Sequence, residues 1–233
     1  MKILNYEEFL NLFKYSQQMK ELIDEYIVYS CLSIANNAKF PTDYTDVKEH
    51  LFESDEYIRL FIVDTEKKVP TIKGFLISAL EKGYNDNTIL HCHGIILDPS
   101  IQGNGYSKTI VEKAIDMTNP DIVTAKTHNP RCFNAFANLK GAISYYPNEF
   151  NDMPEDVINV ARSDEFISNT NENLIYLNAY PDEKIQQSHR NEDLHIVFDR
   201  LAPTDAQAIV VVLNDKKLDL GTNVLKLRRI KNG

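Results

Sequence analysis

The stretch "LHCHGIILDPSIQGNGYSKTI", residues 90–110, decides which fold the sequence predicts. It opens with an apolar run that carries His91 and His93 one residue apart, and such a run bounded by turn residues is typical of a strand. A turn with Gly103 and Gly105 follows, and beyond it the apolar residues recur at helical spacing. The stretch therefore predicts a strand, a glycine-bearing turn and a helix in direct succession.

Outward from this stretch, the hydrophobic periodicity divides the chain into strands and helices. Strands are predicted at 59–65, 71–81, 88–98, 121–127, 174–180 and 207–213. Helices are predicted at 6–36 with a break near Ser16, at 46–53, from Ser107 to the Asn-Pro pair at 119–120, and from Pro130 to Gly141. Residues 148–173 are polar and turn-rich and are expected to form a long loop, and 218–230 is a candidate edge strand.

The order of these elements predicts the fold class. Short connections between the first three strands favour an antiparallel meander, because antiparallel strands can be joined by tight turns. Helices precede and follow the meander, which indicates an α+β or mixed α/β fold with one twisted, mostly antiparallel sheet flanked by helices. We expect a single domain over residues 1–233, with a helical part at 1–55, a core at 59–147, and the long loop and C-terminal strands at 148–233.

The composition limits the classes of partner. With a formal net charge of −9, the chain lacks the clustered cations that nucleic-acid binding needs, and its basic run "LKLRRIK" is interpreted as a solvated strand end. An acidic surface also favours cationic ligands such as amines. No apolar segment approaches the ~20 residues of a membrane span. Three cysteines without paired spacing indicate a reducing compartment, so we expect a cytoplasmic protein that binds neither nucleic acid nor membrane.

The glycine turn has the features of an anion-binding loop. Gly103 and Gly105 can adopt positive φ and let a ligand approach the backbone closely. The N–H groups of such a turn, together with the unpaired N–H groups that open the following helix, suit a pyrophosphate. An ordinary strand-to-helix turn with two glycines explains the same residues. The loop has neither the GKS or GKT of a Walker motif nor the third glycine of a dinucleotide-binding fingerprint.

Residues 102–107, Gln-Gly-Asn-Gly-Tyr-Ser, resemble the Q/R-x-x-G-x-G/A signature of the GNAT superfamily, the Gcn5-related N-acetyltransferases. In that family the loop binds the pyrophosphate of acetyl-CoA. Ser107 stands where the family has Gly or Ala, which is a mild departure because serine is small. The predicted strand order is similar to the GNAT order from about residue 59 to 213. The resemblance implies a GNAT-like acyl-CoA N-acyltransferase fold whose core, 59–147, contains the acetyl-CoA site.

The resemblance also implies which residues hold acetyl-CoA. The backbone of 95–97 would pair with the pantetheine arm as if it were an added strand, and the amides of 103–108 would hold the pyrophosphate. Asn129 resembles an asparagine that often contacts pantetheine, although before Pro130 it serves equally well as a helix cap. The residues implied in cofactor binding are Ile95, Ile96, Leu97, Gln102, Gly103, Asn104, Gly105, Tyr106, Ser107, Lys108 and Asn129.

The two histidines project to the same side of a regular strand, because alternate side chains share a face. Acyl transfer to an amine needs a base, since an alkylammonium is not nucleophilic, and histidine titrates near neutral pH. His91 and His93 resemble the histidine pair of the arylalkylamine N-acetyltransferase branch, at the same distance from the glycine motif, which implies roles in deprotonating the amine. Two core or edge histidines are the alternative. We expect no metal site, since no third ligand lies at a suitable spacing.

The leaving thiolate raises a separate question. Many GNATs carry a tyrosine as general acid four residues before a glycine, in the helix after the fifth strand, and here Ala137 takes that place before Gly141. Tyr146 is predicted to supply the proton from the next loop, with Tyr145 as the alternative. A thiolate that leaves without a dedicated acid is also chemically tolerable, because a CoA thiol has a pKa near that of cysteine, about 8.5.

The sequence thus predicts an N-acetyltransferase that moves an acetyl group from acetyl-CoA to a primary amine by direct transfer within a ternary complex. The acceptor is a small molecule or a peptide of unknown identity, and a homodimer is left open. Two alternatives stand beside this function: a GNAT-fold protein that binds an acyl-CoA without catalysis, and a fold relative that binds no CoA.

Overall fold

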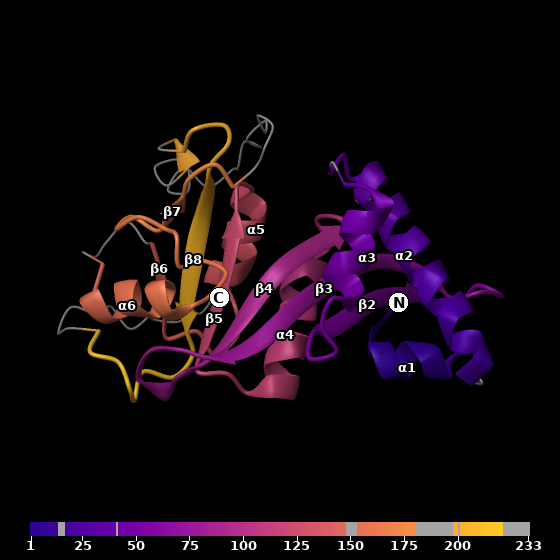
Figure 1. Cartoon of the computed structure of the whole chain (residues 1–233), viewed down its shortest axis with the longest axis horizontal. Coiled ribbons are helices and arrows are strands. Elements are labelled where there is room, and N and C mark those ends of the chain that lie inside the picture. The colour runs from indigo at the N-terminus through magenta and orange to yellow at the C-terminus, as the bar shows by residue number, and fades with distance from the viewer. Residues whose placement is uncertain (14–16, 41, 148–152, 180–197, 200, 221–233) are drawn as a thin grey trace, which may run out of the picture. The chain divides into compact units, whose positions relative to one another are not determined.

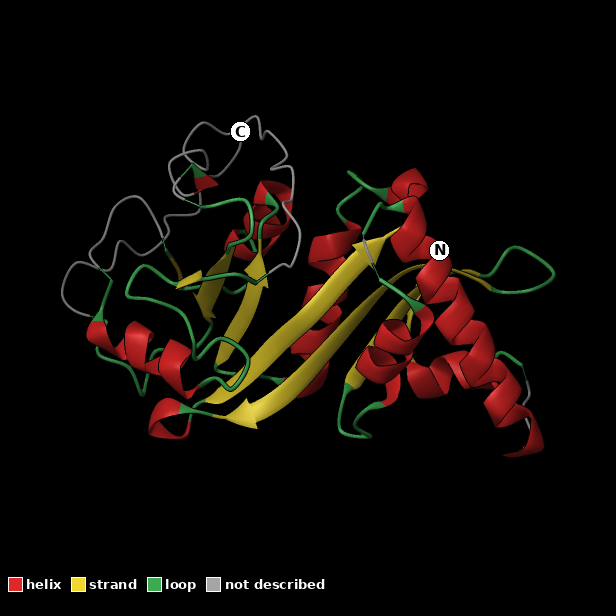
Figure 2. Cartoon of the chain, turned by 45° about the horizontal axis from the view of Figure 1, so that its top comes forward, coloured by secondary structure: helices red, strands yellow, loops and turns green. Residues whose placement is uncertain are grey.

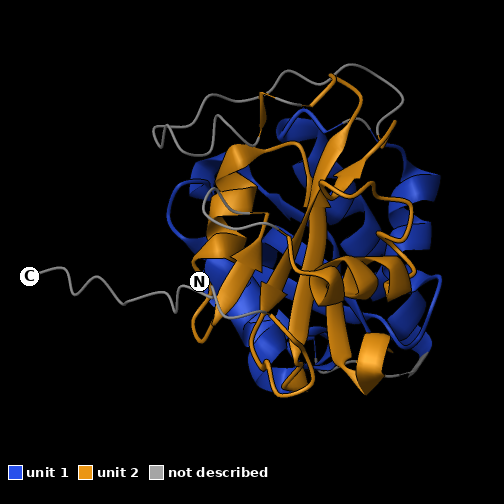
Figure 3. Cartoon of the chain, turned by 90° about the vertical axis from the view of Figure 1, so that its left-hand side faces the viewer, with its two compact units in different colours: residues 1–80, 92–117 blue, residues 81–91, 118–233 orange. Residues whose placement is uncertain are grey.

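The fold is seen in a computed structural model, which describes residues 1–13, 17–40, 42–147, 153–179, 198–199 and 201–220. The chain forms two compact units, drawn in different colours in Figure 3. Unit 1 comprises residues 1–80 and 92–117, and unit 2 comprises 81–91 and 118–233. The chain passes from one unit to the other within the strands β3 (Thr71–Lys82) and β4 (Thr88–Leu97), and again between Met117 and Thr118.

Unit 1 begins with a short strand and helices and continues with longer strands (Figure 1). Besides its parts of β3 and β4, its elements are β1 (Lys2–Asn5), α1 (Tyr6–Asn11), the 3-10 turn η1 (Gln17–Met19), α2 (Lys20–Asn37), α3 (Tyr44–Phe52), β2 (Ile58–Asp64), η3 (Pro99–Ile101) and α4 (Tyr106–Thr118). A capping box opens α1: the Asn5 side chain accepts from the Glu8 N–H, and the Glu8 carboxylate accepts from the Asn5 N–H, each at 2.8 Å. The Asn-x-x-Glu spacing explains why the chain turns from strand to helix here.

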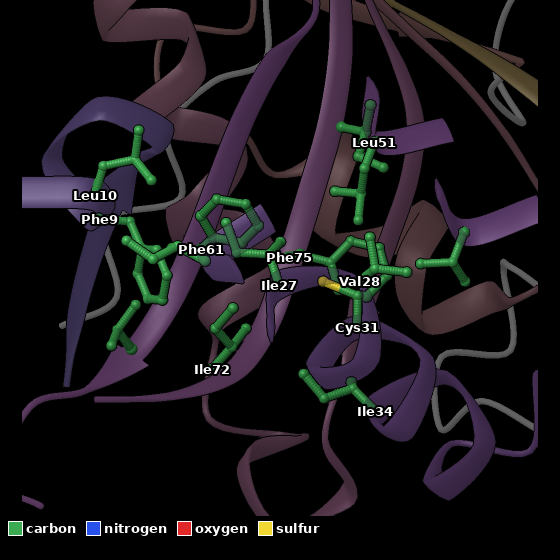
Figure 4. Packing of buried hydrophobic residues seen from close by; sticks show 14 residues of the cluster. Phe9, Leu10, Ile27, Val28, Cys31, Ile34, Leu51, Phe61, Ile72 and Phe75 are labelled. Carbon is green, nitrogen blue, oxygen red and sulfur yellow. The ribbon is translucent and has the colours of Figure 1, made fainter. Parts of the chain in front are cut away.

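The core of unit 1 lies between helices α1–α3 and one face of β2 and β3, as Figure 4 shows from close by. The rings of Phe9 and Phe61 are both fully buried in it, with centroids 5.4 Å apart. Leu60 and Ile62 alternate with Phe61 along β2 and are buried on the opposite face, where α4 lies in Figure 2. Because both faces of β2 are covered, its sequence reads as a nearly continuous apolar run.

Unit 2 is built around β8 (Ala206–Val212), which is buried along its whole length. Strand β5 (Ile122–Thr127) pairs antiparallel with β8, so that Ile122 lies opposite Val212 and Thr127 opposite Gln207. The other elements are η2 (Tyr84–Asp86), α5 (Pro130–Ala137), β6 (Ser144–Tyr146), α6 (Glu155–Ser163) and β7 (Ile175–Tyr176). The apolar face of α6 packs with β8 residues in the core of this unit.

Hydrogen bonding orders the strands β1-β2-β3-β4-β5-β8-β6, with β7 also paired to β8. The pairs β1–β2, β2–β3, β5–β8 and β6–β8 are antiparallel. This is a mixed α/β fold with a mostly antiparallel sheet flanked by helices, as the sequence predicted. None of the described helices combines the length and apolar character that crossing a membrane requires.

Most predicted elements are confirmed with small shifts at their ends. The predicted strands at 59–65, 71–81, 88–98, 121–127 and 207–213 correspond to β2, β3, β4, β5 and β8. The predicted N-terminal helix is interrupted as expected, since α1 ends at Asn11 and α2 begins at Lys20, although Ser16 itself lies outside the described residues. The predicted helix 46–53 appears as α3. The helix that opens at Pro130 ends at Ala137, earlier than the predicted Gly141.

The prediction of a long loop at 148–173 is wrong for residues 155–163, which form α6. Val157, Val160 and Ala161 recur at helical spacing and are buried, while the other residues of the helix are polar except Ile158, which is partly exposed. The apolar stripe of this helix has only three residues, so the polar composition of the segment hides its helical pattern. Asp164, the residue that ends the helix, is buried.

The shortest strands were also missed. β1 and β6 span four and three residues, too few to show a period of two, and they form because a longer neighbouring strand offers hydrogen-bonding groups. Of the predicted strand 174–180, the described residues 174–179 contain the two-residue strand β7, and Tyr180 lies outside the described residues. In the candidate edge strand 218–230, residues 218–220 are not in a strand, and the remainder, with the basic run, lies outside the described residues.

Phe61→Ala is expected to lower the free energy of unfolding by about 3–5 kcal/mol, because the ring is fully buried and its removal leaves a cavity. The control is Leu22→Ala, at a side chain 70% exposed on α2, which should change that free energy by less than ~0.5 kcal/mol. Urea unfolding followed by circular dichroism measures both. Equal unfolding midpoints for the two variants would contradict the packing of unit 1.

Candidate functional site

In unit 1, the side chains of Asp98 and Gln102 form hydrogen bonds with the backbone around the end of β4. Asp98 accepts a hydrogen bond from the Ser100 N–H at 2.9 Å and caps the 3-10 turn η3. The Nε2 of Gln102 donates to the Leu97 carbonyl oxygen at 2.9 Å. The start of the glycine loop is therefore tied to the end of the strand, and the loop 102–108 leads directly into α4.

The two glycines of this loop have the backbone conformation that the sequence suggested. Gly103 and Gly105 both have φ of +79°, in the left-handed region that favours glycine. A Cβ placed on either residue would meet no heavy atom within 4 Å, so the space beside both is open. The Thr109 N–H donates to the Gly105 carbonyl at 3.1 Å and closes the first turn of α4.

This loop fits a pyrophosphate. The N–H groups of residues 106–108 open α4 and have no acceptor within the helix, so they can bind an anion. The helix dipole places partial positive charge at the same end, and Lys108 adds a cation in the first turn. The open space beside the glycines leaves room for the ligand.

His93 lies on the same strand segment, just before residues 95–97, and is half-buried. The ring of Tyr57, the residue before β2, lies 5.0 Å from the His93 ring, centroid to centroid, with the planes at 47°. Tyr57 also packs against the apolar core of unit 1. Unit 1 thus places an imidazole and a phenol next to each other, close along β4 to the segment predicted to bind pantetheine.

In unit 2, His91 occupies a different kind of position. Its side chain is buried, and its Nδ1 lies 2.9 Å from the Thr124 hydroxyl on β5 and 3.3 Å from Asp164 Oδ2 at the end of α6. The Thr124 hydroxyl donates to the same carboxylate oxygen. The Phe166 ring stacks on the imidazole at 4.7 Å between centroids. We call these four residues the His91 cluster.

The carboxyl groups at this cluster differ in their affinity for protons. Burial alone would raise the pKa of Asp164, but the hydrogen bond and charge of His91, with further hydrogen bonds from Thr124 and the Phe166 N–H, hold it below its ordinary value. Glu81, at the end of β3, shows the reverse. Burial, the Asp164 charge and a hydrogen bond with Asp164 raise the pKa of Glu81 to about 7. Near neutral pH, therefore, Asp164 carries a negative charge while Glu81 retains affinity for its proton.

The remaining predicted site residues lie elsewhere in unit 2. Asn129 caps α5, with its side chain accepting from the Arg131 N–H at 2.9 Å, and a contact with pantetheine stays a prediction. Tyr146 lies in β6 and not in a loop, which corrects its predicted location. It is 1% exposed, and burial raises its pKa while the Ser144 hydroxyl lowers it. Its role as general acid stays a prediction. Ala137 is the last residue of α5.

Sequence reasoning missed Tyr57, Glu81, Thr124 and Asp164. The available signal for Thr124 was a hydroxyl between the apolar residues Val123 and Ala125, because a buried polar group implies a partner. Asp164 would have followed from recognising α6. Among the described residues, no three His, Cys, Asp or Glu side chains gather in a way that could hold a metal ion.

Glu81→Gln is expected to make the protein more stable than the wild type at pH 8, with the difference vanishing below pH 4.5. The folded state raises the Glu81 pKa from 4.5 to about 7, so its favourable contribution is complete below pH 4.5 and is lost as pH rises through about 7. Glutamine cannot ionise and escapes this loss. Melting temperatures across this range measure the effect, and Glu172→Gln, at an exposed position of unit 2, is the control. If the melting temperature of Glu81→Gln depended on pH in the same way as that of the wild type, the raised pKa of Glu81 would be contradicted.

Comparison with known proteins gives structural matches only. No protein-family profile and no curated protein sequence matches the chain. A chain of the NatC complex bound to Gag peptide and CoA is 13% identical, with a TM-score of 0.50 over 92% of this chain and 100% of the solved chain. At that identity the likeness shows the fold alone.

Other solved structures align less closely. A variant of spermidine N-acetyltransferase from Vibrio cholerae is 11% identical over 94% of this chain and 98% of its own, with a TM-score of 0.42. An aminoglycoside 6'-N-acetyltransferase from Enterococcus faecium is 14% identical over 55% of this chain, with a TM-score of 0.36. The chain spans 61% of that enzyme and 66% of a GNAT-family protein from Desulfovibrio desulfuricans, less than two-thirds of either. The likeness to the NatC chain agrees with the mixed α/β fold, with a mostly antiparallel sheet flanked by helices, that the sequence predicted.

Proposed function

We propose that the chain is an N-acetyltransferase that transfers the acetyl group of acetyl-CoA directly to a primary amine. The observation that carries the proposal is the loop 102–108, with two glycines at positive φ, open space beside both, and the start of α4 directly after them. The fold supports the same ligand class, since the NatC chain comes from a complex that holds CoA and a peptide.

We expect different residues of unit 1 to contact different parts of acetyl-CoA. The amides of 103–108 would hold the pyrophosphate, and the backbone of Ile95, Ile96 and Leu97 would pair with the pantetheine arm. When bound, acetyl-CoA supplies an acetyl thioester that an unprotonated amine can attack. A backbone N–H near Ile95 would stabilise negative charge on the thioester oxygen during attack. Holding the two reactants together is the main contribution expected from this chain.

His93, with His91, would accept the proton that the acceptor ammonium must lose, through a water molecule. The half-buried ring of His93 and its position beside the 95–97 segment support this role. The acceptor is a small-molecule or peptide amine, which a chain with net charge −9 attracts over a distance. The proposal also includes a relationship to the arylalkylamine N-acetyltransferase branch, a cytoplasmic location and a single domain over residues 1–233. It further includes the predicted roles of His91, Asn129 and Tyr146.

The alternative is a protein that binds an acyl-CoA without catalysis. The presence of Ala137 at the position of the usual tyrosine favours it, because no hydroxyl is available there to protonate the leaving thiolate. A chain of this kind would share the glycine loop and its affinity for CoA. Turnover therefore distinguishes the two functions, and binding alone does not.

CoA at ~100 times its Kd is expected to stabilise the wild type by about 2.7 kcal/mol through mass action. Gly105→Val should abolish this gain, because a branched side chain fills the open space and disfavours positive φ. Gly141→Val is the matched control, since Gly141 has φ of +86° outside the loop and its replacement brings similar strain. Thermal unfolding with CoA and acetyl-CoA measures all three proteins. No shift for the wild type would overturn the cofactor assignment.

His93→Gln is expected to lower kcat/KM for the amine by roughly 10²–10⁴-fold, the range typical of an acid–base group, with acetyl-CoA affinity little changed. His50→Gln, at an exposed histidine of α3, is the control and should retain wild-type activity. Release of CoA thiol in a screen of primary amines provides the measurement. Retained activity with the wild-type pH profile in His93→Gln would remove this residue as the base. A wild type that binds CoA but turns over no amine would favour the alternative.

A further inference from the structure

The His91 cluster joins three elements of unit 2 through one buried carboxylate. Asp164, directly after α6, accepts from the Thr124 hydroxyl on β5 and from the Phe166 N–H at 2.9 Å. Its Oδ2 lies 3.3 Å from Nδ1 of His91 on β4. His91, Thr124 and Asp164 are all fully buried. A charge at such a position is tolerated only when hydrogen bonds and a counter-charge surround it, so these contacts determine the behaviour of the ring.

The hydrogen bonds decide which ring nitrogen of His91 carries the proton. A threonine hydroxyl has one proton, and Thr124 donates it to Asp164. The Thr124 oxygen, 2.9 Å from Nδ1 of His91, can therefore only accept, so Nδ1 must donate. Asp164 Oδ2 presents a second acceptor to the same nitrogen. The neutral ring is thus held with its proton on Nδ1, and its Nε2 carries the lone pair.

The surroundings also fix the orientation of the ring. Phe166 stacks on the imidazole with 25° between the planes, which opposes rotation of the ring. The titratable groups around the cluster are Asp164, Glu81 on β3 and Glu165, which follows Asp164 in the chain. All three are acidic side chains.

We propose that Asp164 is a positioning residue for His91. It fixes the Nδ1–H tautomer, leaves Nε2 as the proton-accepting atom, and balances the positive charge once the ring has taken up a proton. A buried carboxylate orients the catalytic histidine of serine hydrolases in the same way. The step moves one proton: the N–H bond of the ammonium breaks, its electron pair stays on the amine nitrogen, and the proton accepted by the histidine pair forms an Nε2–H bond on His91.

The use of this base rests on the proposed function, since the acceptor ammonium is the source of the proton. Because His91 is buried, the proton reaches Nε2 through water or other hydrogen-bonding groups and not by contact with the amine. The tautomer itself is a property of the folded chain and does not depend on any reaction. The two parts of the proposal can therefore be measured separately.

The tautomer can be measured by NMR on the full chain without ligand. Long-range ¹H–¹⁵N correlation of ¹⁵N-histidine-labelled protein distinguishes Nδ1–H from Nε2–H, and loss of a signal in His91→Gln assigns this ring among six histidines. We expect the Nδ1–H form in the wild type. In Asp164→Asn, whose amide can donate to Nδ1, we expect the Nε2–H form to appear. An Nε2–H tautomer in the wild type would overturn the proposal.

Two further variants keep this test decisive if Asp164→Asn does not fold. Thr124→Val removes the hydroxyl but leaves Asp164 beside Nδ1, so the Nδ1–H form should persist; its loss would assign the tautomer to the threonine and overturn the role of Asp164. Asp205→Asn is the matched control, because Asp205 is also buried in unit 2 but accepts from the N–H groups of Asn178 and Ala202. It should leave the His91 signals unchanged.

The role in the reaction is measured by activity. Asp164→Asn is expected to lower kcat by roughly 10²–10⁴-fold with little change in the KM for acetyl-CoA. If the wild type is active and Asp164→Asn has the same kcat, the positioning role is overturned and the proposed function stays intact. Turnover of no amine by the wild type would overturn the proposed function and the use of His91 as a base, whatever the tautomer.

Discussion

The alternation of side chains along β4 constrains most of the chemistry assigned to this chain. Regular hydrogen bonding of a strand sends every second residue to the same face, so His91 and His93 cannot be placed independently. The same strand continues through 95–97 into the loop that is tied back by Gln102. A slip of one residue in its register would turn both histidines to the opposite face and move the loop as well. The backbone of one strand therefore sets the register of the two histidines, residues 95–97 and the glycine loop together.

The His91 cluster shows how a buried charge can be kept in a core when its partners are complete. Taking a carboxylate out of water is unfavourable, and the hydrogen bonds of Asp164 to His91, Thr124 and the Phe166 N–H offset that cost. Glu81 lies beside this charge and responds by holding its own proton more tightly. The result is a region whose charge changes near neutral pH. Such a cluster links the stability of unit 2 to the same pH range in which a histidine base works.

Sequence reasoning succeeded where a local pattern was long or chemically distinctive. The strands β2, β3 and β4 follow from β-branched and aromatic runs, and the positive φ of Gly103 follows from the absence of a side chain. It failed where the pattern was short or diluted by polar residues, as in β1 and α6. Those elements form because a neighbouring surface completes them, and a single segment contains little trace of that neighbour. The loop predicted across α6 hid Asp164 for this reason.

By itself, the sequence determined the mixed α/β fold, the strand–loop–helix order and the two histidines at alternate positions, because backbone preferences and hydrophobic periodicity act between near neighbours in the chain. Only the tertiary structure decided that the histidines have different surroundings: His93 is half-buried beside Tyr57, whereas His91 is fully buried against Asp164. The hydrogen bond that orients His91 joins residues far apart in sequence. Contacts of that kind depend on how elements pack, and no pattern within one segment encodes them.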